Sequence, residues 1–164
     1  MTTFAHKPDK RESMPYQNIL VAVDLGATTE TVIERAAALA RDNQAALHVL
    51  HVIEPLAITY GGDIPMDFSA IQEEIHSQAK QQLDRLCSGL GVDEANRHLV
   101  TGRPESEIPS QAKAINGDLI VVGTHARWGL ALLLGSTTDG VMHSAECDVL
   151  AVKVDAPAAE DGSA

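Results

Sequence analysis

Apolar residues along this chain occur in two alternating patterns, continuous runs of strand length and longer segments in which they recur at helical spacing. The continuous runs predict strands at residues 17–24, 45–53, 97–101, 118–122 and 148–154. The helical spacing predicts helices from Thr28 to Arg41 and at residues 68–90, 104–116 and 136–145. Strands that alternate with helices indicate an α/β fold, in which a parallel sheet carries helices on both faces and binds ligands at the carboxyl ends of its strands.

Length and composition fit a single domain. A chain of 164 residues with 45% hydrophobic residues can build one sizeable core. We expect residues 16–155 to form the domain, with a flexible lead-in at 1–15 and a disordered acidic tail at 156–164, because both ends are polar and lack a hydrophobic period. The loop at 56–67 is long enough to be either a flap over a site or a mobile surface excursion.

Charge and apolar content argue against several partners. The net charge of −11 argues against nucleic acid and anionic membrane surfaces, since basic patches bind phosphate groups. No apolar run approaches the roughly 20 residues that span a bilayer, and the first residues lack the apolar segment of a signal peptide, so we expect a cytoplasmic protein. Cys87 and Cys147 have neither metal-ligand spacing nor disulfide density, and we expect structural thiols.

The stretch at 118–141 reads DLIVVGTHARWGLALLLGSTTDGV and predicts a strand, a glycine-containing loop and the start of a helix. The loop contains Gly123, Gly129 and Gly135, and it ends in the potential N-cap residues Ser136, Thr137 and Thr138. Glycine permits close backbone approach to a ligand, and the free N–H groups of a first helical turn attract anions. This stretch is therefore a candidate site for a phosphate or another anion.

Four separated motifs resemble the universal stress protein family and occur in that family's order. They are NILVAVD at 18–24, HVIE at 51–54, VGTHARWGLALLLGST at 122–137 and CDVLAV at 147–152. The resemblance covers about residues 16–154 and implies a three-layer α/β sandwich that is Rossmann-like and of the adenine-nucleotide-hydrolase type, with five parallel strands in the order 3-2-1-4-5. It also implies a homodimer and, in one branch of the family, ATP or another adenine nucleotide as ligand.

The family's nucleotide loop has the pattern G-x-x-G, nine residues, then G-[ST]. Gly123 matches the first glycine, Ala126 stands at the second, and eight residues separate Ala126 from the final Gly-Ser pair. Family members that bind ATP also have a serine where this chain has Gly26. The retained Gly-Ser pair and Arg127 favour nucleotide binding, whereas Ala126, Gly26 and the shorter loop favour a protein without nucleotide.

Individual site residues follow from the strand order that the resemblance implies. Strands one and four are neighbours in that order, so Asp24 lies beside Gly123 at the topological switch point. Asp24 can accept hydrogen bonds from a ribose or help to hold magnesium with phosphate, and equally it can cap the first helix or hold the turn that follows. In the loop, Arg127 can pair with a phosphate and His125 can donate one hydrogen bond, or both can simply be solvated. The residues expected to bind the nucleotide are Ala22, Val23, Asp24, Val52, Gly123, Ala126, Arg127, Gly129, Gly135, Ser136, Thr137 and Thr138.

Other interpretations of the α/β pattern lack their motifs. A P-loop needs a lysine before its Ser or Thr, yet residues 129–136 read GLALLLGS, and the Gly-x-Gly-x-x-Gly of a dinucleotide site is missing. A response regulator needs clustered acids after its first strand, where this chain has one Asp, and no hydrolase triad can be assigned. His48 and His51 are three apart on a predicted strand and point to opposite faces, so we expect no metal site from histidines.

Two functional classes remain. The first is a stress-response binding module in which ATP or a related nucleotide alters dimer or partner contacts and any hydrolysis is slow and incidental, so no dedicated enzyme is expected. The second is a nucleotide-free homodimeric interaction protein of the family's UspA-like branch. In both, the apolar last strand at 148–154 is a sheet edge that is expected to pair with its symmetry mate.

Overall fold

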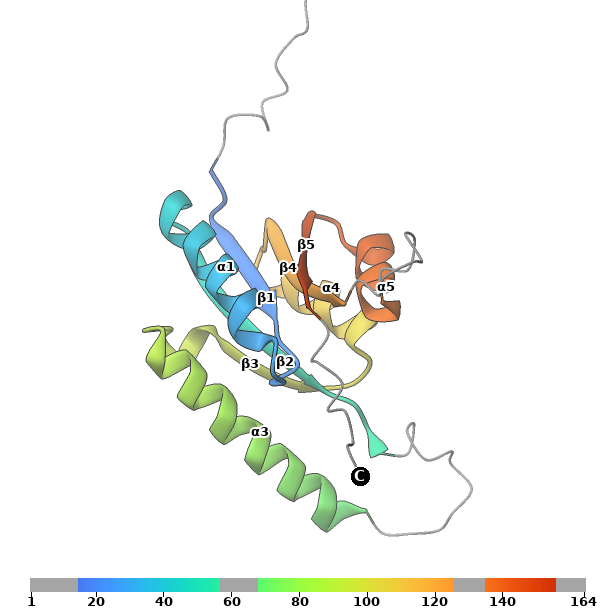
Figure 1. The fold of residues 1–164 in the computed structure, drawn as a ribbon. Coiled ribbons are helices and arrows are strands. Elements are labelled where there is room, and N and C mark those ends of the chain that lie inside the picture. The colour runs from blue at the N-terminus through green and yellow to red at the C-terminus, as the bar shows by residue number, and fades with distance from the viewer. Residues whose placement is uncertain (1–14, 57–67, 126–134, 156–164) are drawn as a thin grey trace, which may run out of the picture.

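The computed structural model describes residues 15–56, 68–125 and 135–155, which form a five-stranded parallel sheet in the order β3-β2-β1-β4-β5 (Figure 1). The strands are β1 Asn18–Ala22, β2 Ala46–Ile53, β3 Arg97–Thr101, β4 Leu119–His125 and β5 Asp148–Val154. The helices are α1 Thr29–Asn43, α3 Ser69–Gly89, α4 Pro104–Ala114 and α5 Ser136–Ser144, with a short 3-10 helix, η2, at Glu94–Asn96. The predicted Rossmann-like α/β fold and its strand order are confirmed.

The sheet lies between two helical layers, with α1 and α3 on one face and α4 and α5 on the other (Figure 1). Alternate residues of the central strand β1 serve the two layers, as the period of a strand requires. Ile19 and Val21 pack in the core with α1 and α3, whereas Leu20 packs in the core with α4 and α5. Because both faces of β1 are covered, its apolar residues run consecutively.

The ends of several elements differ from the sequence prediction. β4 continues to His125 and pairs with β5 as far as Val154, so Gly123 and His125 belong to a strand rather than to the predicted loop. Helix α4 ends at Ala114, two residues before the predicted end, and Asn116 behind it has a left-handed backbone with φ of 53°. Asparagine tolerates this conformation better than most residues, so it can end a helix where glycine commonly does.

Several sequence expectations lie outside the described residues. These are the tail at 156–164, the loop at 57–67, and the lead-in apart from Pro15. None of the helices in the described ranges combines the length and the apolarity that crossing a lipid bilayer requires. Cys87 and Cys147 are both free thiols, and burial raises the pKa of each, which keeps them protonated at neutral pH.

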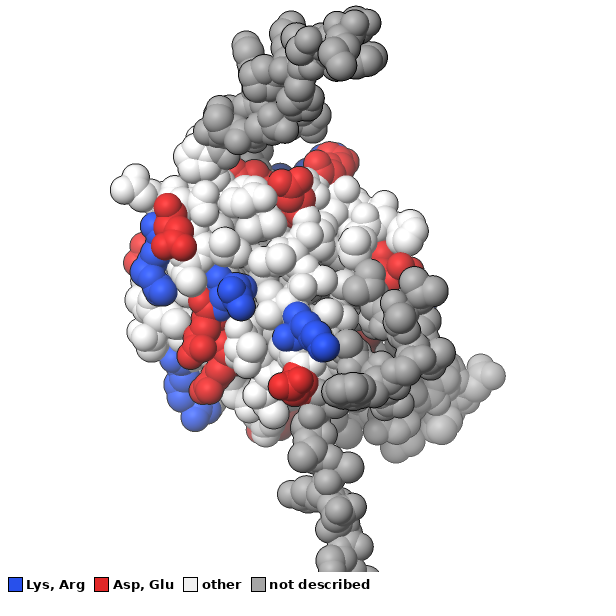
Figure 2. Space-filling model, turned by 45° about the horizontal axis from the view of Figure 1, so that its top comes forward, with Lys and Arg blue, Asp and Glu red and all other residues white. Residues whose placement is uncertain are grey.

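Basic and acidic side chains are mixed on the face of the molecule shown in Figure 2. Lys and Arg lie there in separate small groups, most of them next to Asp or Glu. Among the described residues, Lys80 pairs with Asp84 at 2.7 Å and Lys113 with Glu146 at 2.9 Å. Surface ion pairs of this kind contribute little stability.

Candidate functional site

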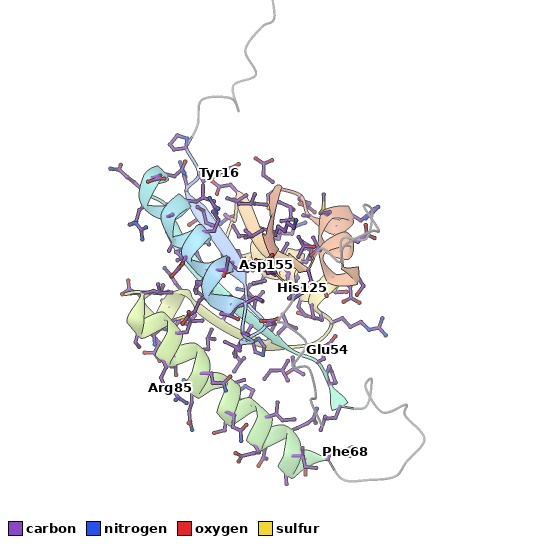
Figure 3. The ribbon with its side chains drawn as sticks, in the orientation of Figure 1. Tyr16, Glu54, Phe68, Arg85, His125 and Asp155 are labelled. Carbon is purple, nitrogen blue, oxygen red and sulfur yellow. The ribbon has the colours of Figure 1, made fainter. Side chains whose placement is uncertain are left out.

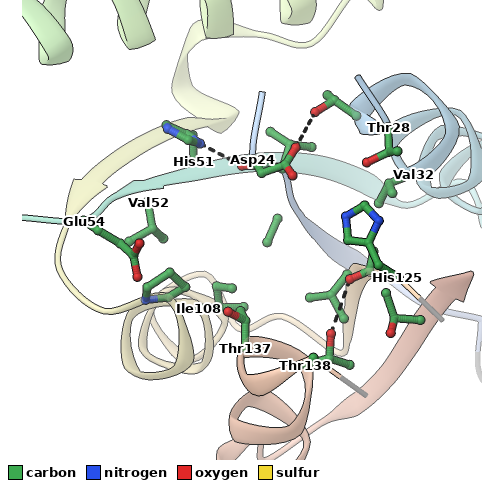
Figure 4. Close-up of a pocket in the computed structure, with 18 of the residues that line it drawn as sticks. Asp24, Thr28, Val32, His51, Val52, Glu54, Ile108, His125, Thr137 and Thr138 are labelled. Carbon is green, nitrogen blue, oxygen red and sulfur yellow. Dashed lines mark hydrogen bonds between the residues drawn. The ribbon is translucent and has the colours of Figure 1, made fainter. Parts of the chain in front are cut away.

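A cavity of about 580 Å³ lies at the carboxyl ends of β1, β2 and β4 (Figure 4). Its walls come from these strand ends, from the N-terminal parts of α1, α4 and α5, and from Ile75 of α3. The volume falls within the range of about 300–1,000 Å³ that small-molecule sites occupy. The cavity therefore occupies the switch point between β1 and β4, where open α/β sheets bind their ligands.

Nine of the twelve predicted nucleotide-binding residues line this cavity. They are Ala22, Val23, Asp24, Val52, Gly123, Gly135, Ser136, Thr137 and Thr138. The other three, Ala126, Arg127 and Gly129, lie outside the described residues. Residues as far apart in the sequence as Ala22 and Thr138 thus meet in one cavity, because parallel strands bring their carboxyl ends to the same edge of the sheet.

The cavity also contains residues that the sequence argument did not select. They include Thr28, Thr29, His51, Glu54, Pro104 and Ile108. Figure 3 places Glu54 and His125 toward the carboxyl end of the sheet, with Tyr16 at the opposite end. Most of the missed residues lie at the end of a predicted strand or the start of a predicted helix. Their position in the α/β topology is therefore the signal by which they could have been found.

Asp24 organises the turn between β1 and α1. Its Oδ1 accepts hydrogen bonds from the Gly26 N–H at 2.8 Å and from the Thr29 hydroxyl at 3.0 Å. Between Asp24 and Gly26, Leu25 has φ of 60°, a left-handed conformation that costs a non-glycine residue roughly 1–2 kcal/mol. Asp24 therefore holds the turn that follows β1, which is the structural role considered for it. Its Oδ2 has no hydrogen-bond partner among the described residues.

Helix α5 directs its first turn at the cavity. Gly135 is the N-cap residue, and Ser136, Thr137 and Thr138 are the first three residues of the helix, so their expected role as side-chain caps is wrong. The Thr138 hydroxyl donates instead to the Gly123 carbonyl at 3.3 Å, which joins α5 to β4. Because the first-turn N–H groups lack acceptors within the helix, they are available to an anion in the cavity.

Gly123 and Gly135, the two described glycines of the predicted glycine-containing loop, have different surroundings. A Cβ at Gly123 would lie 2.9 Å from Cγ2 of the buried Val32 on α1, so packing of helix on strand requires glycine there. A Cβ at Gly135 would meet no atom of the described residues within 4 Å. Packing against the described part of the chain therefore does not explain this glycine, in contrast to Gly123.

The acidic and imidazole side chains of the described lining are Asp24, Glu54, His51 and His125. No Lys or Arg belongs to the lining within the described ranges. Val52 and Ile108 give one part of the cavity an apolar surface, beside the carboxylate of Glu54 (Figure 4). The arrangement suits a ligand with an apolar ring, hydroxyl groups and an anionic end.

A second polar cluster lies on the face of the sheet that α4 covers, away from the cavity lining. His48 Nδ1 is 3.1 Å from His98 Nε2, the two rings are stacked, and Gln111 Nε2 is 3.1 Å from His98 Nδ1. Burial lowers the pKa of both histidines, and the neighbouring His48 lowers that of His98 further. In the described part of the chain no group of three or more His, Cys, Asp or Glu side chains can hold a metal ion.

Comparison with known proteins agrees with this architecture. The model of the universal stress protein family matches residues 15–153. Universal stress protein A homolog 1 from Coxiella burnetii is 42% identical over 141 residues, which are 85% of this chain and 97% of that protein.

Solved structures show the same fold. Two chains from Pseudomonas aeruginosa superpose with TM-scores of 0.62 and 0.63 at 26% and 25% identity over 84% of this chain, which spans about half, 47%, of each. A structure described as a universal stress protein in complex with cAMP has a TM-score of 0.54 at 25% identity and covers 84% of this chain and 97% of its own. With its motifs, its strand order and these matches, the chain belongs to the universal stress protein family.

Proposed function

We propose that this protein is a stress-response binding module that holds ATP or a related adenine nucleotide in the cavity between β1 and β4. The observation that carries the proposal is the position of the α5 N-terminus, whose free N–H groups and open Gly135 face the same cavity as Asp24 and Val52. The relative whose structure is described as a complex with cAMP supports a nucleotide as the ligand class.

The ends of the cavity suggest an orientation for the nucleotide. The phosphates bind at the first turn of α5, where backbone N–H groups and the helix dipole favour negative charge. Asp24 Oδ2 accepts a hydrogen bond from a ribose hydroxyl, because its Oδ1 is already used by the turn. The base lies in the apolar part beside Val52 and Ile108.

The backbone of Val52 gives this proposal its preference for adenine. The Ile53 carbonyl accepts from Gly102 and so faces β3, and the Leu50 carbonyl accepts from Val23 and so faces β1. The backbone groups of successive strand residues point in alternate directions, so the N–H and C=O of Val52 point toward the β1 side of β2. Strand β1 has already ended at this level. One donor beside one acceptor matches the N1 acceptor and the N6 donor of adenine.

Magnesium would enter with the nucleotide. Since the described residues contain no cluster of three metal ligands, phosphate oxygens and water would supply most of its coordination. Asp24 would bind either the ribose or the metal ion with its Oδ2, and Glu54 is the other carboxylate of the described lining. We assign no catalytic residue, and any hydrolysis is slow and incidental to binding. We place this binding in the cytoplasm.

A second candidate function is a nucleotide-free homodimeric interaction protein. The absence of Lys and Arg from the described cavity lining favours it, because a triphosphate then relies on helix N–H groups and on residues outside the described ranges. In both functions we propose dimerisation through β5, an edge strand whose outer N–H and C=O groups have no strand beside them in the described sheet.

Purification without added nucleotide, followed by mass spectrometry of bound small molecules, separates the two functions. The binding module releases an adenine nucleotide on denaturation, or takes one up when ATP, ADP, AMP or cAMP is added. A folded protein that neither carries nor takes up any of these contradicts nucleotide binding and leaves the interaction function.

A further inference from the structure

The end of strand β1 is held by a side chain instead of by backbone pairing. The last backbone bond of the β1–β2 ladder runs from the Val23 N–H to the Leu50 carbonyl, at 2.9 Å. The next group along β1, the Val23 carbonyl, lies 2.8 Å from Nδ1 of His51. A carbonyl can only accept, so His51 Nδ1 carries the hydrogen and donates it.

This contact stands where a parallel ladder would place its next bond. In a parallel pair, a residue that donates to one partner accepts from the residue two positions further along the other strand. The expected donor to the Val23 carbonyl is therefore the N–H of Val52. In the described residues this bond is not made, and the imidazole of His51 satisfies the carbonyl instead.

We propose that His51 is a positioning residue that ends the β1–β2 ladder and so keeps the Val52 N–H free for a ligand. The imidazole lies at the position from which Val52 would donate to the Val23 carbonyl, and it competes with Val52 for that acceptor. It also anchors the residue directly before Asp24, at the turn where Leu25 has φ of 60°. The base-binding part of this inference rests on the proposed nucleotide function, whereas the ending of the ladder does not.

Replacement of the His51 imidazole should increase backbone pairing and yet weaken ligand binding, a combination that a purely structural role does not predict. His51→Leu removes the donor and leaves the Val23 carbonyl open, so Val52 pairs with it and the ladder gains one bond. The N–H that a base would use is then occupied, and affinity falls although backbone pairing increases. His51→Asn is the matched control, since an asparagine amide can donate from about the position of Nδ1.

The test combines amide hydrogen exchange by NMR with calorimetric titration of ATP on the full chain. We expect the Val52 amide to exchange fast in the wild type and at least about tenfold more slowly in His51→Leu, with His51→Asn like the wild type. For ATP we expect affinity about two- to tenfold weaker in His51→Leu and restored in His51→Asn, as the loss of one hydrogen bond implies.

Amide exchange of Val52 and ATP affinity test the two parts of the inference independently. If the wild type binds no nucleotide but Val52 exchange changes as stated, the ending of the ladder stands and the proposed function fails. If the Val52 amide is already protected in the wild type, or stays unprotected in a folded His51→Leu, the inference is overturned whatever the nucleotide does. Equal ATP affinity in wild type and His51→Leu contradicts its link to the ligand.

Discussion

Replacement of Gly123 by alanine tests whether this glycine is needed for packing of helix α1 on the sheet. The new Cβ would lie 2.9 Å from Cγ2 of Val32 and 4.0 Å from Cγ1 of Val154. Relief is difficult because Gly123 is fixed in the ladder opposite Val152, and Val32 is only 4% exposed. Overpacking of this kind costs about 1–3 kcal/mol, which corresponds to a fall of about 2–12 °C in Tm for a chain of this size.

Val32→Ala provides the compensating change for this prediction. Alone it removes buried methyl groups and costs about 2 kcal/mol. Combined with Gly123→Ala it also removes the clash, so the double variant should be more stable than the sum of the two single effects by about 1–3 kcal/mol. Urea unfolding of the four proteins measures this coupling. Wild-type stability in Gly123→Ala, or strict additivity in the double variant, would refute the packing argument.

The remaining predictions concern pH, the loop, the dimer and the chain ends. Because burial lowers the pKa of His48 and His98 in the folded state, their contribution to stability is complete above the ordinary histidine pKa of about 6.5 and declines as the pH falls toward the lowered values. Changing both to Gln should flatten urea stability between pH 7 and 5, and an unchanged slope would contradict this role. Ala126→Gly should tighten ATP binding about five- to thirtyfold if position 126 needs a left-handed backbone, with Gly89→Ala as a distant control, and equal affinity would remove that requirement. Val152→Pro in β5 should give monomer or aggregate in light scattering, and an intact dimer would exclude β5 as the interface. Limited proteolysis should cleave both chain ends first, and cleavage that begins within residues 104–154 while the ends survive would contradict the predicted domain limits.

Sequence patterns identified the sheet chiefly because its central strands contain continuous apolar runs that both helical layers bury. The run in β1 and the matching run in β4 each specify a central parallel strand without any tertiary information. The strand order came from the family resemblance, since spacing alone does not fix which parallel strands are neighbours. The edge strand β3 was also found, because its short apolar run ends at a glycine and a helix-starting proline.

The details of the site depended on contacts that a linear pattern does not contain. Gly123 has the appearance of a ligand-binding glycine, yet its neighbour is Val32, which lies 91 positions earlier in the chain. The roles of His51 and of the His48 and His98 pair likewise depend on register between strands, where a shift of one residue would reverse the faces. Such long-range contacts become visible only when the strands are placed side by side.

Titration of ATP into wild type and Gly135→Val tests the central claim most directly. The backbone of Gly135, with φ of −49° and ψ of 155°, is accessible to valine, and a Cβ there meets no atom of the described residues within 4 Å. The variant should therefore fold normally while its side chain occupies the space assigned to phosphate at the α5 N-terminus. The account predicts saturable heat for the wild type and none for Gly135→Val. Equal binding in both contradicts the phosphate position, and no heat in either folded protein with ATP, ADP or AMP contradicts nucleotide binding itself.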